Sequence, residues 1–345
     1  MKSYNLYLSI LMVMFFLLSC KKRADQNISL KFAETMVSEE LPIDFMLGKP
    51  YQLKISDSLL LIADHVDEKA ITIYNYKNNK YLKEVINIGQ GPSEIILPIQ
   101  LTIREKDTIG ILERQKGLYS TFLISDILTN TVQCLNQINF GNIDRITETN
   151  NGYISAGFYE EGSIGIHNIR GELINVINIY PDYLNKINDI SIKYRYGQGS
   201  IAFNKESDIF AFAGYFIGEI KFYSLNDSNK LEIRNYYNLS LSSDLQRRIN
   251  ASTNTTIERT DIEYFTDIYT TDHYFYVLYS GKSMDEREKA RESHILLFNS
   301  AGKYVKCYKS DRKLYKICVS PDDKHLYALS LSDELDYILV QLNLS

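Results

Sequence analysis

The sequence predicts an all-β fold, a six-bladed β-propeller with four-stranded blades, from three observations. Short runs of β-branched and aromatic residues follow one another, with turn residues between them. Extended helical periodicity is hard to find. The runs group in fours, and successive groups begin about 44–63 residues apart. Four strands per repeat at this spacing are typical of propeller blades.

Six groups of runs can be placed in order along the chain. The first five supply four runs each, and the sixth supplies three before the sequence ends. A seventh group would have to lie within Ser240 to Asp261, but the polar opening of that segment indicates a short helix with a loop. Six blades are therefore predicted. The groups span Tyr51–Gly89, Ile99–Phe140, Ile143–Tyr180, Gly199–Leu239, Ile262–Ser310 and Lys313–Asn343.

The sixth group lacks an outer strand, and the start of the chain offers one. The run ISLKFAE, Ile28 to Glu34, precedes the first group and has no other partner. Docking it on the last blade would close the ring and protect the edges of both strands. The sequence therefore predicts that the C-terminal strand and residues 28–34 are neighbours.

The first residues have the pattern of an export signal. Leu6 to Leu18 is almost wholly apolar and follows a single positive charge, Lys2. The run is short for a membrane span and has the flanks of a signal peptide. Its closing residues, Leu17-Leu18-Ser19-Cys20, resemble a bacterial lipobox, which implies cleavage before Cys20 and acylation of that thiol. The alternative is an uncleaved N-terminal anchor.

These features predict three parts of the chain. Residues 1–19 form a lipoprotein signal peptide, residues 20–27 a lipidated tether, and residues 28–345 the propeller. The acylated Cys20 would hold the protein on membrane lipid, since more than one acyl chain gives firm anchoring. The predicted location is the bacterial cell envelope, after export from the cytoplasm.

Charge and cysteine content exclude several classes of function. Without Lys2, the chain keeps 37 basic and 43 acidic side chains, a net charge of −6. This balance argues against binding to nucleic acid, which needs a basic footprint. Three widely spaced cysteines remain beyond Cys20 and indicate no disulfide framework. There is no CxxC and no paired histidine spacing, so the sequence predicts neither a metal site of these residues nor a cofactor.

The stretch IGQGPSE, Ile88 to Glu94, has the glycines of a phosphate loop but lacks its other parts. No lysine follows the second glycine, and the segment leads into a strand rather than a helix. The repeat instead places it at a crossover between blades, as it does the shorter YGQGS at Tyr196 to Ser200. Glycine permits the sharp turn needed there. Gln90 and Glu94 are predicted either to brace the crossover or also to contact a ligand.

Two stretches resemble known propellers. VSPDDKHLYALS, Val319 to Ser330, resembles the repeat of TolB-like propellers. GQGPSE, Gly89 to Glu94, comes at the end of the first group and resembles the hallmark of bacterial six-bladed propeller lipoproteins. With the lipobox, the resemblance covers essentially the whole chain. It implies the propeller and the lipid anchor, but it carries no activity that can be transferred.

Candidate ligand contacts are expected on one face of the ring. The connections between blades and those between the second and third strands share the face on which the channel opens, and ligands often bind there. The alternative for each charged residue on this face is that it lies on the solvated surface and contacts no ligand. The candidates are Asp64, His65, Gln90, Glu94, Glu113, Arg114, Lys116 and Gln198.

The fifth group contains a long charged loop. Ser283 followed by Glu286 has the spacing of a helix capping box, and good helix formers follow. The loop is predicted to hold a small helix over the channel mouth. It would serve as a lid or a docking element for a partner, or it is an exposed insertion.

Two functions remain open from the sequence. The first is a membrane-anchored binding module that recognises an envelope protein, peptide or glycan. The second is a propeller hydrolase or lactonase with a calcium-type site in the channel, for which Asp144 and Glu263 are conceivable ligands. The second requires three or more acidic or amide side chains to converge within about 3 Å of one point on the axis.

Overall fold

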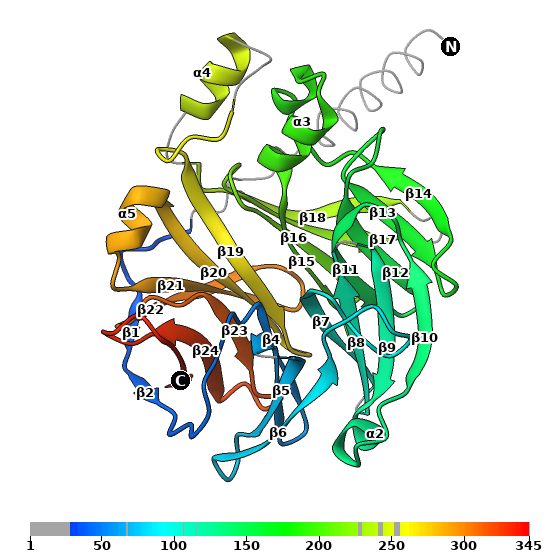
Figure 1. Ribbon diagram of the computed structural model, residues 1–345. Helices are drawn as coiled ribbons and strands as arrows, with labels where there is room; N and C mark the ends of the chain where they lie inside the picture. The colour runs from blue at the N-terminus through cyan, green and yellow to red at the C-terminus, as the bar shows by residue number, and fades with distance from the viewer. Residues whose placement is uncertain are drawn as a thin grey trace, which may run out of the picture.

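The computed structural model describes residues 28–66, 68–105, 107–114, 116–226, 230–240, 244–251 and 256–344. These residues form six sheets arranged as a ring around a central channel (Figure 1). Each sheet is a meander of four neighbouring strands, and blade 5 gains a fifth strand. The predicted fold class, the blade number and the strand number per blade are therefore confirmed.

The first strand of each blade lines the channel, and the strands then follow in order toward the rim. Blades 1 to 3 are β3–β6 (Gln52–Ser56, Leu59–Val66, Lys69–Asn75, Lys80–Asn87), β7–β10 (Pro98–Glu105, Thr108–Glu113, Leu118–Leu123, Cys134–Asn139) and β11–β14 (Ile143–Thr149, Gly152–Gly157, Ile164–Asn168, Leu173–Ile177). Blades 4 to 6 are β15–β18 (Gly199–Asn204, Ile209–Gly214, Glu219–Leu225, Leu231–Asn238), β19–β22 (Ile262–Thr270, Tyr274–Ser283, Ser293–Asn299, Tyr304–Ser310) and β23–β25 (Lys316–Val319, His325–Leu331, Tyr337–Asn343).

The hydrophobic core lies between neighbouring blades. All six residues of β16 are buried, which explains why such strands read as continuous apolar runs, whereas β18 at the rim is largely exposed. Phe222 of blade 4 shows the packing across one interface. Its ring centroid lies 5.3 Å from that of Phe275 and 5.0 Å from that of Phe298, both in blade 5. Such aromatic pairs add to the free energy gained by burial.

An N-terminal strand completes the last blade, as predicted, but it is a different segment. Strand β2 (Ser38–Glu40) pairs antiparallel with β25, with Ser38 opposite Leu342. The predicted segment, 28–34, instead lies against blades 4 and 5, and β1 (Glu34–Met36) pairs parallel with β22. An edge strand needs only backbone hydrogen bonds. The polar sequence Ser-Glu-Glu can therefore close the ring without an apolar pattern that marks it in the sequence.

Five short helices occur in the described residues. The expected helix between Ser240 and Asp261 is present, and so is the expected capped helix after Ser283, where both hydrogen bonds of the capping box form. The helix that ends in YGQGS was missed. None of these helices is long and apolar enough to cross a bilayer. They are α2 (Ile124–Leu128), the 3-10 helix η1 (Leu184–Lys186), α3 (Ile190–Gly197), α4 (Asp244–Ala251) and α5 (Met284–Lys289).

Candidate ligand site in the central channel

Two of the predicted ligand contacts are buried carboxylates that hold crossovers between blades. Asp64 lies near the end of β4, the second strand of blade 1, and its Oδ2 accepts the Gly48 N–H at 3.0 Å. Glu113 ends the second strand of blade 2, and its Oε2 accepts the Ile96 N–H at 2.9 Å. Both side chains are 1% exposed. Burial raises the pKa of Asp64, although backbone hydrogen bonds oppose the shift.

Glu94 folds back on the glycines of IGQGPSE. Its Oε2 accepts the Gly91 N–H at 2.7 Å, and a Cβ added at Gly89 would lie 2.1 Å from the same oxygen. The two glycines therefore leave the space that the carboxylate occupies. Gln90, between them, is exposed to solvent. This geometry matches the bracing role considered for Glu94.

The other predicted residues do not converge on one point. Arg114 is 58% exposed, and its Nε lies 2.8 Å from Asp144 Oδ1 in blade 3. The Nζ of Lys116 lies 3.5 Å from Glu113 Oε1, which groups these residues at the boundary of blades 2 and 3. His65 is exposed. Gln198 caps α3 by donating from Nε2 to the Arg195 carbonyl at 2.9 Å. Cys20 lies outside the described residues.

The acidic residues considered for calcium are engaged by arginines. Arg114 pairs with Asp144, and Arg287 of α5 forms an ion pair with Glu263. The Arg287 Nη1 also donates to the Tyr215 hydroxyl at 3.0 Å, which ties α5 to blade 4. Within the described ranges, no group of three or more histidine, cysteine or acidic residues is arranged to hold a metal ion.

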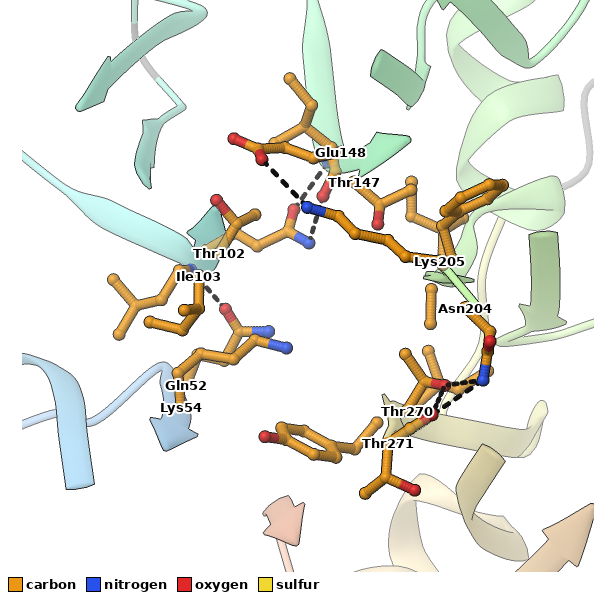
Figure 2. Close-up of a pocket in the computed structure, with 18 of the residues that line it drawn as sticks. Gln52, Lys54, Thr102, Ile103, Thr147, Glu148, Asn204, Lys205, Thr270 and Thr271 are labelled. Atoms are coloured by element: carbon orange, nitrogen blue, oxygen red, sulfur yellow. Dashed lines mark hydrogen bonds and ion pairs between the residues drawn. The ribbon is translucent and has the colours of Figure 1, made fainter. Parts of the chain in front are cut away.

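A cavity of about 230 Å³ occupies one end of the channel (Figure 2). Five inner strands, β3, β7, β11, β15 and β19, supply its wall. Lys205 and Thr271 lie in connections between first and second strands, so the cavity is at the opposite end from the face expected to bind ligands. None of the eight predicted contacts lines it.

One wall of the cavity is a continuous hydrogen-bonded network. Thr102 Oγ1 lies 2.5 Å from the Tyr119 hydroxyl, which donates to Glu148 Oε1 at 2.6 Å. The second Glu148 oxygen lies 3.6 Å from Lys205 Nζ (Figure 2). Burial and the Glu148 charge raise the pKa of Tyr119 well above its usual value, so the phenol stays protonated as a donor. The Glu148 carboxylate is therefore paired within the protein.

Two amide side chains of the wall are also satisfied. Gln100 bonds both backbone groups of Ile146 at 2.7 Å, with Nε2 donating and Oε1 accepting. Asn204 Nδ2 donates to the Thr271 carbonyl at 2.8 Å, and its Oδ1 accepts the Ser207 N–H at 2.9 Å. These bonds fix neighbouring inner strands to each other and leave little hydrogen-bonding capacity for a ligand.

Gln52 and Lys54 of β3 differ from the rest of the wall. Gln52 Oε1 accepts the Leu101 N–H, which turns the amide nitrogen toward the cavity. Lys54 Nζ lies 4.5 Å from the centre of the Tyr269 ring. No hydrogen bond or ion pair of either side-chain nitrogen is found among the described residues. Burial lowers the pKa of Lys54, and the negative charge of Asp267 opposes this shift.

The sequence contains a pattern that indicates this pair. A search restricted to charged residues in loops does not find it. Gln52 and Lys54 alternate with apolar residues on an inner strand, in QLKIS. Residues two apart on a strand point to the same side. On the innermost strand of a propeller blade, that pattern directs two polar side chains at the axis.

The fold and the cavity define a class of protein, a six-bladed propeller with a small polar site at one end of its channel. More specifically, the chain belongs to the TolB-like six-bladed propeller family, whose model, "TolB-like 6-blade propeller-like", matches residues 30–322. This confirms the resemblance to TolB-like propellers that the sequence carries. No curated protein matches the chain.

Two solved structures share the architecture. A DUF4221 family member from Bacteroides vulgatus aligns with a TM-score of 0.60 at 11% identity, over 90% of this chain and 97% of its own. A predicted exported protein from Bacteroides fragilis aligns with a TM-score of 0.60 at 13% identity, over 90% of this chain and 95% of its own. At these identities the likeness concerns the fold alone.

Proposed function

We propose that the protein is a binding module of the bacterial cell envelope and that the channel cavity is its recognition site. The observation that carries this proposal is the cavity itself, which five blades enclose at one end of the channel. A rigid ring positions its lining residues without a conformational change, which reduces the entropy lost on binding. The catalytic alternative gains no support, because Asp144 and Glu263 are paired with arginines.

The volume of the cavity limits the ligand. About 230 Å³ is below the roughly 300–1,000 Å³ of typical sites for drug-sized ligands. It suits a small molecule, or the end of a larger one such as the last residue of a peptide or the last sugar of a glycan. This agrees with the expectation of an envelope peptide, protein or glycan as partner.

The envelope location is supported by the sequence and by one relative. The apolar run and the Leu17-Leu18-Ser19-Cys20 motif precede the described residues and have the pattern of a lipoprotein signal. The similar protein from Bacteroides fragilis is named as a predicted exported protein. Acylation of Cys20 would keep the propeller at the membrane, where it would meet envelope components.

Site-specific photo-crosslinking in cells tests this function. A photoreactive residue would replace Asp272, which is exposed and lines the cavity, in the full chain. The matched control replaces Lys303, an exposed residue in the β21–β22 turn at the rim. We expect a product, identified by mass spectrometry, that forms from position 272 and not from position 303. Equal or absent products at both positions would reject the channel as the recognition site.

A further inference from the structure

We propose that the channel cavity binds a carboxylate, held by the Lys54 ammonium and the Gln52 amide. This inference rests on the proposed function and adds the chemical class of the ligand. It follows from the donors that the cavity presents, from the charges around them and from the size of the space.

The free polar groups of Gln52 and Lys54 are donors. The Gln52 oxygen already accepts the Leu101 N–H, so its amide presents only N–H groups to the cavity. An ammonium has three N–H donors and no acceptor. Both side chains come from the same side of β3 and point into the cavity (Figure 2). A ligand that satisfies them must therefore supply hydrogen-bond acceptors, and a carboxylate does this with two oxygens and a negative charge that matches the ammonium.

The carboxylates of the protein near this pair are already engaged. Glu148 accepts from Tyr119 and faces Lys205. Asp267, whose charge favours the protonated form of Lys54, lies 3.6 Å from Lys316 Nζ. Asp267 also accepts a backbone N–H, that of Ile317, at 3.0 Å. Two lysines thus share one acid in this sector of the channel.

The environment of Lys54 favours an incoming anion. Burial removes much of the water that would solvate its ammonium. The contact with the face of the Tyr269 ring replaces part of this solvation, but it is weaker than an ion pair with a carboxylate. A hydrogen bond to an ion is about twice as strong as one between neutral groups, and more so where water is excluded. Burial lowers the pKa of Lys54, which is the sign expected for an ammonium that lacks a matched counter-ion.

One lysine and one amide match a single negative charge. Phosphate carries more charge and three strong acceptor oxygens, and it is commonly bound by clustered arginines or by helix N-termini, neither of which lines this cavity. The carboxylate could be the C-terminus of a peptide or the acid group of a sugar. Both sources share the same acid group, and a peptide-like probe and a sugar-acid probe separate them.

Calorimetric titration of the full chain tests the proposal. N-acetylglycine represents a peptide C-terminus and N-acetylglycinamide is its neutral match, whereas glucuronate represents a sugar acid and glucose its neutral match. We expect one acid to bind at millimolar or lower concentration, about tenfold or more tightly than its neutral match. Inorganic phosphate is expected to bind more weakly than that acid. The acid that binds identifies the source.

Three variants locate the binding. Lys54→Met keeps the length of the side chain and removes the charge, and Gln52→Glu keeps the acceptor for Leu101 while it replaces the donor by a carboxylate. Each is expected to weaken binding of the acid about tenfold or more. Lys77→Met, at an exposed lysine outside the cavity, removes the same charge and should leave binding unchanged. Circular dichroism confirms that each variant is folded.

Binding of no acid at millimolar concentration, equal binding of acid and neutral probe, or unchanged binding in Lys54→Met overturns the carboxylate proposal. The function itself is judged separately by the crosslinking at position 272. A neutral partner crosslinked there would reject the carboxylate and leave the binding module standing. Absence of any partner specific to position 272 would reject the function.

Discussion

Glu113 Oε2 accepts the backbone N–H of Ile96 at 2.9 Å, so a carboxylate at the end of one strand holds the chain as it enters the same blade. Asp64 repeats the arrangement in blade 1 with Gly48. Both acids lie near the end of a second strand, Glu113 as its last residue and Asp64 two residues before the end. They act as braces of the crossovers, and their burial leaves them little access to a ligand.

The Glu113 brace predicts a specific loss of stability. Glu113→Ala would leave the Ile96 N–H without its acceptor, and the free energy of unfolding should fall by about 1–3 kcal/mol. Urea unfolding of both proteins measures this change. The matched control is Glu232→Ala, because Glu232 forms an ion pair at the surface and is 53% exposed. That variant should lose no more than about 1 kcal/mol. Equal losses of free energy of unfolding in the two variants would show that the Glu113 hydrogen bond contributes no more than a surface ion pair.

The hydrogen-bonded network on the cavity wall predicts a difference in stability between two tyrosine variants. Tyr119→Phe removes the hydroxyl that donates to the buried Glu148, and should lower the free energy of unfolding by about 1–3 kcal/mol. Tyr51→Phe is the control, since no hydrogen bond of the Tyr51 hydroxyl is found in the described part of the chain. Thermal unfolding compares the two. A Tyr119 variant as stable as the Tyr51 variant would contradict the role given to the hydroxyl.

Ring closure predicts that proline substitutions at two neighbouring residues have different effects. The Leu41 N–H donates to the Leu339 carbonyl, and hydrogen-bonded pairs alternate along an antiparallel ladder, so Glu39 and not Glu40 should donate to β25. Glu39→Pro should cost about 1–3 kcal/mol and speed hydrogen exchange in Tyr337–Asn343. Glu40→Pro should affect exchange there much less. The same exchange in both variants would count against the register.

Lys54 predicts how stability varies with pH. Its pKa is lowered in the folded protein, so the unfolded chain binds more protons between that value and the usual lysine pKa of about 10.4. The contribution of Lys54 to stability therefore rises with pH across this interval. The groups that act on Lys54 are Asp267, Lys316 and Cys318, besides the Tyr269 ring.

Lys54→Met should remove the contribution of this residue. The variant should be at least as stable as the parent at neutral pH, and its advantage should shrink as the pH approaches the usual lysine pKa. Urea unfolding at a series of pH values checks both points. Lys316 also has a lowered pKa and keeps its own contribution in the variant. Parallel stability curves for the two proteins would refute the assignment to Lys54.

The proposed anchor predicts the behaviour of two cysteine variants. Cys20→Ala should release the protein from membranes or leave an unprocessed precursor, because no thiol remains to be acylated. Cys134→Ala, at a partly buried cysteine of blade 2, should fractionate like the parent. Immunoblots of membrane and soluble fractions show both results. Normal processing and full membrane retention of Cys20→Ala would argue against a lipoprotein.

Most of the fold could be predicted because it repeats. Buried middle strands leave continuous apolar runs, and five repeats of four runs followed by one of three all indicate the same fold. The closing strand could not be predicted because it has no such apolar pattern. Ser38–Glu40 contributes backbone hydrogen bonds and no buried apolar face. Helix α3 escaped because its eight residues give only a short amphipathic pattern.

The site was harder to predict, because the charge of a residue does not show whether it holds a crossover or contacts a ligand. In the sequence Asp64 and Glu113 are acids near predicted loops, but folding buries them against backbone N–H groups. Gln52 and Lys54 lie inside a strand, where no loop pattern marks them as candidate ligand contacts. Their importance depends on the ring, which brings five inner strands around one space.

The pairing of Ser38 with Leu342 joins residues about 300 positions apart in the chain. During synthesis each earlier blade can form from its own neighbouring strands, but the circle stays open until the final strand has been made. A chain that stops before Tyr337 would present an open blade with an unpaired edge, which invites aggregation or degradation. The join therefore works as a check on completeness, since the full architecture is reached only by a polypeptide made to its end.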